Sequence, residues 1–387
     1  MINYKVIKRM IVDFVDRLRI KRMQRNEKIK YRAKCRVEIY RNIELSAEQK
    51  KKIDVLYLEN YGKKIPYVWH QNFMAHSGKF DEKYFPELLY IPEFEQYMNL
   101  WKEYVDAFAD KNVISILANS IGVKTPKVIL SVVKGINRDE KLEYKSKDEA
   151  FELLRNIGRV FIKPTVDSCS GCGCFIADFK DGIDTISKKS VLDIYNSLGT
   201  DFVVQSVVKC HDSISRIYDK SVNTFRIITY RWKDEILHMP VIMRIGQGGS
   251  FLDNAHAGGM FIAVDDDGTL HKNAMTEFNL QFAFHPDTDF VFENYKIELL
   301  PKVIEAAKKM HVVMPQIGVA NWDFTIDETG EPLLIEANLH AGSVWLPEMA
   351  HGCGAFGERT AEVLRWLKLM RSTKKSKRHK YAFGKTD

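Results

Sequence analysis

The chain has 387 residues, enough for two or three domains, and its 45% apolar and 11% aromatic content is typical of a globular protein with a sizeable core. It contains no apolar run of the roughly 18 to 20 residues that a membrane span needs. Charged residues interrupt every apolar run near the N-terminus, which excludes the layout of a signal peptide. Six cysteines in a chain of this length do not form a secreted disulfide framework, so we expect a cytoplasmic protein.

The net charge of +7 is concentrated at the two ends of the chain. Residues 1–41 hold 14 Lys and Arg against four acidic residues, and residues 365–387 hold nine against one, which leaves −11 for the remainder. Basic ends on an acidic body favour contact with an anionic surface such as lipid headgroups or nucleic acid. For residues 372–387 a solvated basic tail is the simpler interpretation.

Near the N-terminus, apolar residues recur at helical spacing with Lys and Arg between them, so residues 3–34 are predicted to form a basic amphipathic helix. The apolar positions are Ile7, Met10, Ile11, Phe14, Val15 and Leu18. This face could lie on an anionic membrane, where each basic side chain adds about 1 kcal/mol, or dock on the protein's own core. The membrane alternative would make the protein peripheral at the inner face of the membrane. No nucleic-acid partner is expected.

Two further helices are predicted at 45–60 and 92–110, joined by an aromatic-rich segment with turn residues and no clear period. Residues 1–98 are therefore predicted to form a helical N-terminal region. Asp110 is a candidate N-cap for a helix that ends at Gly122.

The central part of the chain alternates strands with short helices. The expected elements are a strand at 128–133, a helix at 147–156, strands at 160–164 and 175–179, a helix at 189–198 and a strand at 201–208. A loop of small residues, 167–174, joins the two middle strands. Small residues let main-chain N–H groups surround phosphate oxygens, and Lys163 supplies positive charge at the entrance of this loop.

A long hairpin follows, in which Arg226 and Arg244 interrupt otherwise apolar strands. Because a lone buried charge costs several kcal/mol, each Arg must be paired or line a cleft. Asn254 opens a loop of φ-permissive residues that contains Gly258 and Gly259, and a hairpin over 260–271 comes next.

After a helix at 297–310, two apolar runs flank the turn Asp-Glu-Thr-Gly and predict a closing hairpin. Asp323 would lie opposite Glu336, and Asn338 would share a face with Glu336. Carboxylates that face each other across a sheet repel, unless a cation lies between them. Oxygen ligands without Cys or His suit Mg²⁺, which usually takes further ligands from nucleotide phosphates. The alternative is an exposed edge hairpin with ordinary acidic residues.

The order of these elements resembles the ATP-grasp superfamily, in particular the branch found beside sugar-transfer genes, a cousin of ribosomal-protein glutamate ligases and D-alanine–D-alanine ligases. The resemblance covers about 98–371. Its motifs are Asn223-x-x-Arg226, Asn254-x-x-x-Gly258-Gly259 and Asp323-x12-Glu336-x-Asn338. Asn321 departs from the pattern, because several ligases carry a basic residue there.

The resemblance implies an α+β fold in which two lobes, 99–205 and 206–371, clasp ATP, with a basic tail at 372–387. ATP phosphates would contact Lys111, Lys163 and the loop residues Ser168, Ser170 and Gly171. The adenine edge would lie against the main chain near Gln205 and Val207. Two Mg²⁺ ions would bind Asp323, Glu336 and Asn338. Arg226, Arg244 and Asn254 would face the transferred phosphoryl group and the acceptor.

The function implied is ATP-dependent ligation of a carboxylate to an amine through an acyl phosphate, with a small molecule or glycan precursor as substrate in surface-polysaccharide biosynthesis. Phosphoryl transfer to a hydroxyl acceptor and a non-catalytic nucleotide-binding partner of a glycosyltransferase are the alternatives. Replacing Asp323 or Glu336 by Ala should abolish ATP turnover and leave the fold intact. His211, His256 and His340 are candidate acid–base groups.

Overall fold

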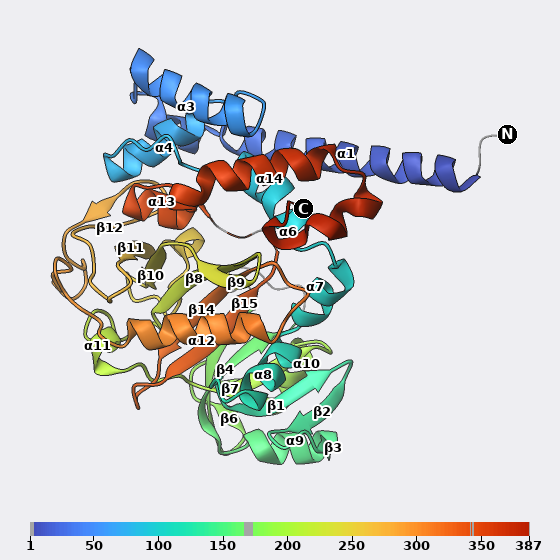
Figure 1. Cartoon of the computed structure of the whole chain (residues 1–387). Helices are drawn as coiled ribbons and strands as arrows, with labels where there is room; N and C mark the ends of the chain where they lie inside the picture. The colour runs from blue at the N-terminus through green and yellow to red at the C-terminus, as the bar shows by residue number, and fades with distance from the viewer. Residues whose placement is uncertain (1–3, 166–172, 341, 343, 387) are drawn as a thin grey trace.

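The structure is a computed structural model that describes residues 4–165, 173–340, 342 and 344–386, with the main chain alone described at 4–9 and 257. A helical layer, a large lobe and a smaller lobe follow one another down the molecule (Figure 1). Both lobes combine an antiparallel sheet with helices. The predicted α+β architecture with a helical N-terminal region is therefore confirmed.

The N-terminal layer contains helices that are mostly short. They are α1 (Tyr4–Lys30), α2 (Lys34–Tyr40), α3 (Ala47–Asn60), α4 (Val68–Ser77), α5 (Glu87–Leu89), the π-helix η1 (Tyr90–Glu95) and α6 (Gln96–Met98). Helix α4 falls in the segment that was expected to be irregular. Its buried side chains include Trp69, His70 and Phe73. Because the helix is enclosed by neighbours, it has no polar stripe and no amphipathic period.

The helix predicted over 92–110 is interrupted at Asn99. The side-chain oxygen of Asn99 accepts hydrogen bonds from the main-chain nitrogens of Gly318 (2.8 Å) and Val319 (3.0 Å). After this break the chain continues into α7 (Lys102–Phe108) and α8 (Lys111–Ser120). Asp110 caps α8 as predicted, accepting from the main-chain nitrogen of Asn112 at 2.8 Å.

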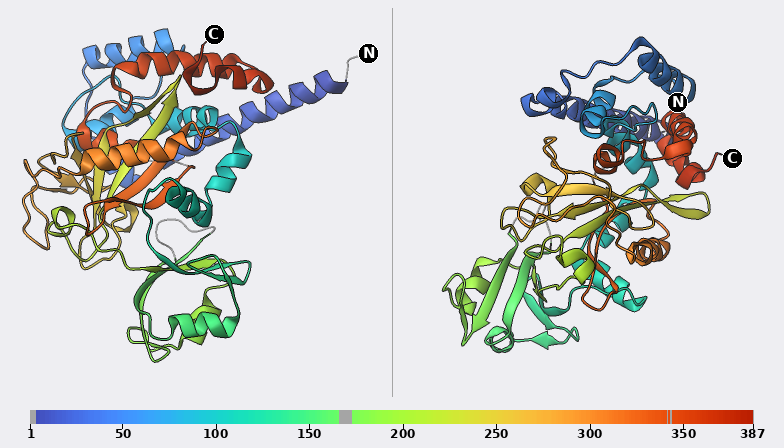
Figure 2. Two further views of the ribbon diagram at one scale, coloured as in Figure 1. Left: turned by 60° about the horizontal axis from the view of Figure 1, so that its bottom comes forward. Right: turned by 90° about the vertical axis from the view of Figure 1, so that its left-hand side faces the viewer.

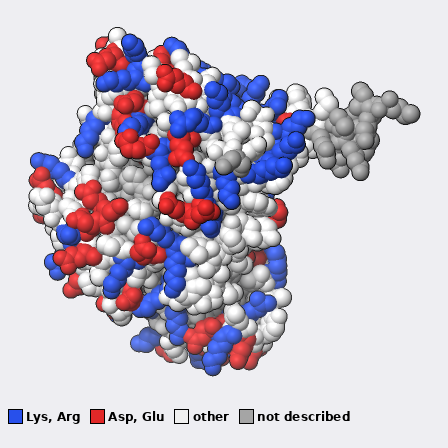
Figure 3. All heavy atoms as spheres, in the orientation of Figure 1, with Lys and Arg blue, Asp and Glu red and all other residues white. Residues whose placement is uncertain are grey.

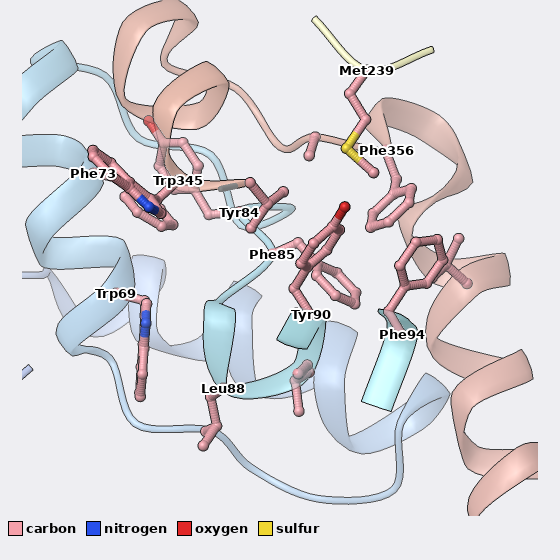
Figure 4. Close-up of a cluster of buried hydrophobic side chains, with 14 of the residues drawn as sticks. Trp69, Phe73, Tyr84, Phe85, Leu88, Tyr90, Phe94, Met239, Trp345 and Phe356 are labelled. Atoms are coloured by element: carbon pink, nitrogen blue, oxygen red, sulfur yellow. The ribbon is translucent and has the colours of Figure 1, made fainter. Parts of the chain in front are cut away.

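The N-terminal layer shares one hydrophobic core with helices α13 (Trp345–His351) and α14 (Thr360–Ser372) and with one face of the large sheet. Figure 4 shows part of this core, in which Phe94 stacks on Tyr90 and packs edge-on against Phe356. Each fully buried side chain of this size contributes roughly 1.5 to 3 kcal/mol. The N-terminal layer is therefore a cover of the large sheet rather than a separate core.

The small lobe is a seven-stranded antiparallel sheet with helices α9 (Lys147–Leu154) and α10 (Val191–Ser197) on one face. Its strands are β1 (Val128–Val133), β2 (Ile136–Asp139), β3 (Tyr144–Lys145), β4 (Gly158–Pro164), β5 (Phe175–Lys180), β6 (Ile183–Asp184) and β7 (Phe202–Ser206), in the order β3-β2-β1-β7-β4-β5-β6. Val160 and Ile162 of β4 face the helices. Since side chains alternate along a strand, Phe161 and Lys163 point from the opposite face.

The large lobe is an eight-stranded sheet between two helical layers. Its strands are β8 (Thr224–Trp232), β9 (Glu235–His238), β10 (Val241–Ile245), β11 (Met260–Val264), β12 (Ala274–Met275), β13 (Gln281–Phe282), β14 (Val319–Ile326) and β15 (Pro332–Asn338), in the order β13-β12-β11-β10-β8-β14-β15 with β9 beside β8. Helix α12 (Leu300–Val312) covers one face, and the N-terminal layer covers the other (Figures 1 and 2). The short helix α11 is Asp212–Ser215.

The basic C-terminal segment is ordered, unlike the solvated tail expected for residues 372–387. It forms the segment η4 (Lys375–Gly384), which is 3₁₀-helical apart from a kink at 381–383. Arg378 in this segment is buried, and its Nη1 lies 2.6 Å from Oδ2 of Asp16 on α1. A buried carboxylate needs such a partner, so this ion pair holds the two basic ends of the chain together. Within the described residues, no helix is both long and apolar enough to cross a membrane.

Candidate active site

The closing hairpin brings the predicted metal ligands together. Asp323 on β14 lies directly opposite Glu336 on β15, as predicted, and a bulge follows Asp323. The side-chain nitrogen of Asn338 lies 3.3 Å from Oδ2 of Asp323. The Asp323 side chain is only 3% exposed, whereas that of Glu336 is 32% exposed. Glu336 therefore offers the more accessible carboxylate to a ligand.

Two arginines hold Asp323 from neighbouring strands. Nε of Arg226 on β8 lies 2.5 Å from Oδ1 of Asp323, and Nη2 of Arg244 on β10 lies 3.0 Å from Oδ2. Arg244 also donates to the hydroxyl of Thr224 (2.8 Å) and pairs with Asp253 (3.4 Å). The requirement that each buried Arg find a partner is thus met. Thr224 and Asp253 were not identified from the sequence, where the requirement was only that each Arg be paired or line a cleft.

Burial and neighbouring positive charge have opposite effects on the pKa values of Asp323 and Asp253. Burial by itself raises the pKa of Asp323, but the positive charges of Arg226 and Arg244 outweigh it and hold the pKa below its usual value. At Asp253 burial is the stronger effect, so its pKa is raised despite the neighbouring Arg244. Asp323 is therefore the ionised centre of this cluster.

Two lysines face the same region from different lobes. Lys111, at the first turn of α8, places its Nζ 3.3 Å from Oε1 of Glu336. Lys163, on β4, is buried, and burial together with the charge of Lys111 lowers its pKa to about 8. The main chain of Lys163 pairs with Val203 in the sheet, whereas its side chain forms no ion pair or hydrogen bond with a described residue. An anion at this position would relieve the cost of burying its charge.

A cavity of about 1400 Å³ lies between the two sheets and contains all of these groups. Its walls include Phe161 and Phe175 of the small lobe, beside Gln205 and Val207 at and just after the end of β7. Apolar walls with a few polar groups are usual for a small-molecule site. The cavity is large enough for a nucleotide and a second substrate.

All the described residues of the predicted site line this cavity. They are Lys111, Lys163, Gln205, Val207, Arg226, Arg244, Asn254, Asp323, Glu336 and Asn338. Ser168, Ser170 and Gly171 lie outside the described residues. The shared location agrees with the sequence analysis, while the individual roles of these residues in binding and catalysis stay predictions.

A histidine lies in the same cavity beside Asn254. Asn254 caps a short 3₁₀ turn, accepting from the main-chain nitrogen of His256 at 3.0 Å. Nδ1 of His256 lies 2.5 Å from Oε2 of Glu277, whose other oxygen pairs with Arg36 of the N-terminal layer. Burial raises the pKa of Glu277, but His256 and Arg36 lower it more strongly. Of the other candidate histidines, His340 lines the cavity and His211 does not.

An interlobe cavity with two lysines, paired arginines and a hairpin of oxygen ligands, between antiparallel α+β lobes, defines an ATP-grasp protein. A family model described as "sugar-transfer associated ATP-grasp" matches residues 92–363. The chain belongs to this family. The expected resemblance is thereby confirmed, and the family supports ATP-dependent ligation as the class of activity. Among curated proteins, none matches the sequence significantly.

Solved structures with similar folds include several ligases. The VanG D-Ala:D-Ser ligase from Enterococcus faecalis shows 14% identity and a TM-score of 0.42 over 68% of this chain and 63% of its own. The L-amino acid ligase from Bacillus licheniformis shows 13% identity and a TM-score of 0.36, over 64% of this chain and 44% of its own. The D-alanine–D-alanine ligase from Bacillus anthracis complexed with ATP shows 16% identity and a TM-score of 0.38, over 69% of this chain and 68% of its own. The chain thus spans less than two thirds of the length of the first two, and the family match alone carries the assignment.

Proposed function

We propose that the protein is an ATP- and Mg²⁺-dependent ligase that joins a carboxylate to an amine through an acyl phosphate. The substrates we infer are an amino acid or similar group and a sugar acid used in surface-polysaccharide biosynthesis. The observation that carries this proposal is the convergence of Lys111, Lys163, Asp323 and Glu336 in one interlobe cavity. The family's association with sugar transfer supports the choice of substrate class.

The residues present fit both ATP and Mg²⁺. The side chain of Lys163 is buried without a described partner, and Lys111, which pairs with Glu336, is close enough to lower the pKa of Lys163. A polyphosphate in the cavity would therefore meet two cations. Glu336, Asn338 and Asp323 offer the hard oxygen ligands that Mg²⁺ prefers. When bound, Mg²⁺ would neutralise charge on the phosphates.

The reaction has two steps. A carboxylate oxygen of the first substrate attacks the γ-phosphorus of ATP, forming an acyl phosphate and releasing ADP. The amine of the second substrate then attacks the acyl carbon, phosphate leaves and the amine loses a proton. Arg226 and Arg244 use Nε and Nη2 for their buried partners, and Nη1 of each makes no hydrogen bond to a described residue. These Nη1 groups are available to the transferred phosphoryl group.

His256 is placed to accept the proton of the amine. If Nδ1 donates to Glu277, the tautomer that results leaves a lone pair on Nε2. Nε2 has no hydrogen-bond partner among the described residues, and His256 lines the cavity. A carboxylate that orients a histidine in this way is a common arrangement for general bases. We assign Glu277 as the positioning residue and His256 as the base.

Phosphoryl transfer to a hydroxyl is the second candidate reaction, and the observation that supports it is the presence of Asn321. Asn321 is buried, and its side-chain nitrogen donates to the main-chain oxygen of Asn338 at 3.2 Å. It therefore cannot supply the positive charge that several ligases carry at this position to hold an acyl phosphate. The two reactions differ in their products, since only ligation releases free phosphate and forms an amide.

The test is a screen of the purified protein with ATP, MgCl₂ and pairs of amino acids and uronic acids, followed by ADP release and mass spectrometry of the products. An amide with free phosphate supports ligation, and a phosphorylated acceptor supports phosphotransfer. Glu336→Gln should lose ADP formation, and so should the wild-type protein in EDTA. Glu331→Gln, at the exposed turn of the same hairpin, is the matched control. Absence of ADP with every pair would contradict an enzymatic role and favour a non-catalytic nucleotide-binding partner.

A further inference from the structure

Helix α1 packs against the rest of the protein, including η1 and η4, through the face opposite its apolar stripe. The positions that meet the body recur at helical spacing, and Asp16, Ile20 and Glu27 among them are buried. Asp16 pairs with Arg378, and the side-chain nitrogen of Gln24 lies 2.8 Å from Oε1 of Glu93 on η1. Among the described side chains of α1, the docking face therefore relies on polar contacts and on one buried aliphatic residue, Ile20.

The opposite face of α1 carries an exposed apolar stripe. Ile11, Phe14, Val15 and Leu18 follow the spacing i, i+3, i+4, i+7, which places them on one side of the helix. Phe14 is 61% exposed and Leu18 is 49% exposed. The N-terminal half of α1 projects beyond the rest of the molecule (Figures 1 and 2). The core-docking alternative for this stripe is therefore not what the structure shows.

Basic residues surround the stripe. Arg17, Lys21, Arg22, Arg25 and Lys28 are exposed on α1 and form no ion pair with a described residue. The C-terminal segment η4, also rich in exposed lysines, lies against α1, where the main-chain nitrogen of Lys375 donates to Asp13 at 2.8 Å. Figure 3 shows Lys and Arg gathered along the described part of the projecting helix. The two basic ends of the chain thus lie next to each other.

We propose that α1 lies on an anionic lipid surface, with the stripe Ile11, Phe14, Val15 and Leu18 inserted among the lipids and the flanking arginines and lysines on the headgroups. Charge complementarity selects this occupant, because insertion satisfies the apolar side chains while anionic headgroups neutralise the basic ones. A second copy of α1 packed on the stripe would instead bring two strongly basic surfaces together. The inference does not depend on the reaction that the cavity catalyses.

The experiment is co-sedimentation of the full chain with vesicles of phosphatidylcholine alone and with 30 mol% phosphatidylglycerol (about that fraction gives a strongly anionic surface). Wild type should bind the anionic vesicles and lose binding as salt is raised. Phe14→Gln with Leu18→Gln should weaken binding about 100-fold, since two inserted apolar side chains are lost. Arg22→Gln with Arg25→Gln should weaken it about 30-fold at low salt.

A matched control keeps the test specific. Phe284 and Leu192 are a Phe and a Leu with 51% and 45% exposure, outside α1 and outside the cavity lining. Phe284→Gln with Leu192→Gln should bind vesicles like wild type. Circular dichroism and urea denaturation of each variant check that the fold is retained. Equal binding to neutral and anionic vesicles, or full binding by the Phe14/Leu18 variant, overturns the proposal, as does self-association through the stripe without vesicle binding.

Discussion

Replacing Lys163 by methionine should stabilise the nucleotide-free protein while removing its response to ATP. The pKa of Lys163 lies at about 8 against a reference value of 10.5, so at about 1.4 kcal/mol per pH unit the folded state loses ~3 kcal/mol by holding this charge at neutral pH. Met has a similar length and no charge. A gain of this size would raise the melting temperature by roughly 5 to 10 °C.

The stability difference between Lys163→Met and wild type should depend on pH. Below pH 8 lysine 163 is protonated in both the folded and the unfolded state, and the full cost is present. Between pH 8 and 10.5 the unfolded chain holds one more proton than the folded one, so wild-type stability rises relative to the variant. The advantage of Lys163→Met should therefore shrink through that window and vanish above it.

The assay is urea denaturation of both proteins from pH 7 to pH 10.5, with and without ATP and MgCl₂. Lys180→Met, at an exposed site on the neighbouring strand β5, removes the same charge and is the control. ATP should stabilise wild type and the control but not Lys163→Met. The reasoning is refuted if Lys163→Met is less stable than wild type at pH 7 without nucleotide, or if its advantage is the same at pH 7 and pH 10.

The remaining predictions separate binding from structure. Asp323→Asn should lower the free energy of unfolding by about 3 to 5 kcal/mol as well as abolish ADP formation, because it leaves Arg226 buried without a counter-charge and leaves Arg244 with Asp253 alone. A variant as stable as wild type in urea would argue against the ion cluster. Glu336→Gln should abolish ADP formation with unfolding within about 1 kcal/mol of wild type, since its side chain is partly exposed; substantial turnover would remove it from the site. Glu277→Gln should reduce kcat about 100-fold with little change in KM for ATP, and a parallel rise in KM would instead indicate a structural role.

These predictions revise one sequence-based expectation. From the sequence, Asp323 and Glu336 were equivalent carboxylates whose loss would spare the fold. The structure makes them different, because Asp323 is enclosed by two guanidinium groups and Glu336 faces the cavity beside Lys111. Burial depends on what packs above the strand, which the strand's own residues do not specify.

Local patterns identified most of the fold and of the candidate site. Alternation and turn residues located the longer strands of both lobes but not the short strands β2, β3, β6, β12 and β13. The Asp-Glu-Thr-Gly turn placed Asp323 opposite Glu336. Local patterns did not predict helix α4, which is buried on nearly all sides. They also did not predict the helix interruption at Asn99, which is imposed by hydrogen bonds to residues some 220 positions away along the chain. Neither a uniform burial pattern nor a distant hydrogen bond leaves a periodic signal.

The amino-acid sequence by itself determined the motif of oxygen ligands and the amphipathic character of α1, since each depends on spacing within one segment, and the order of its motifs supplied the resemblance that implied an α+β fold. Only the tertiary structure decided which groups meet: that Asp253 and Thr224 complete the arginine cluster, that Glu277 holds His256, and that α1 docks by Asp16 and leaves Phe14 exposed. The physical reason is that contacts between distant segments depend on how the layers pack, and a helix with two usable faces does not reveal which of them the protein covers.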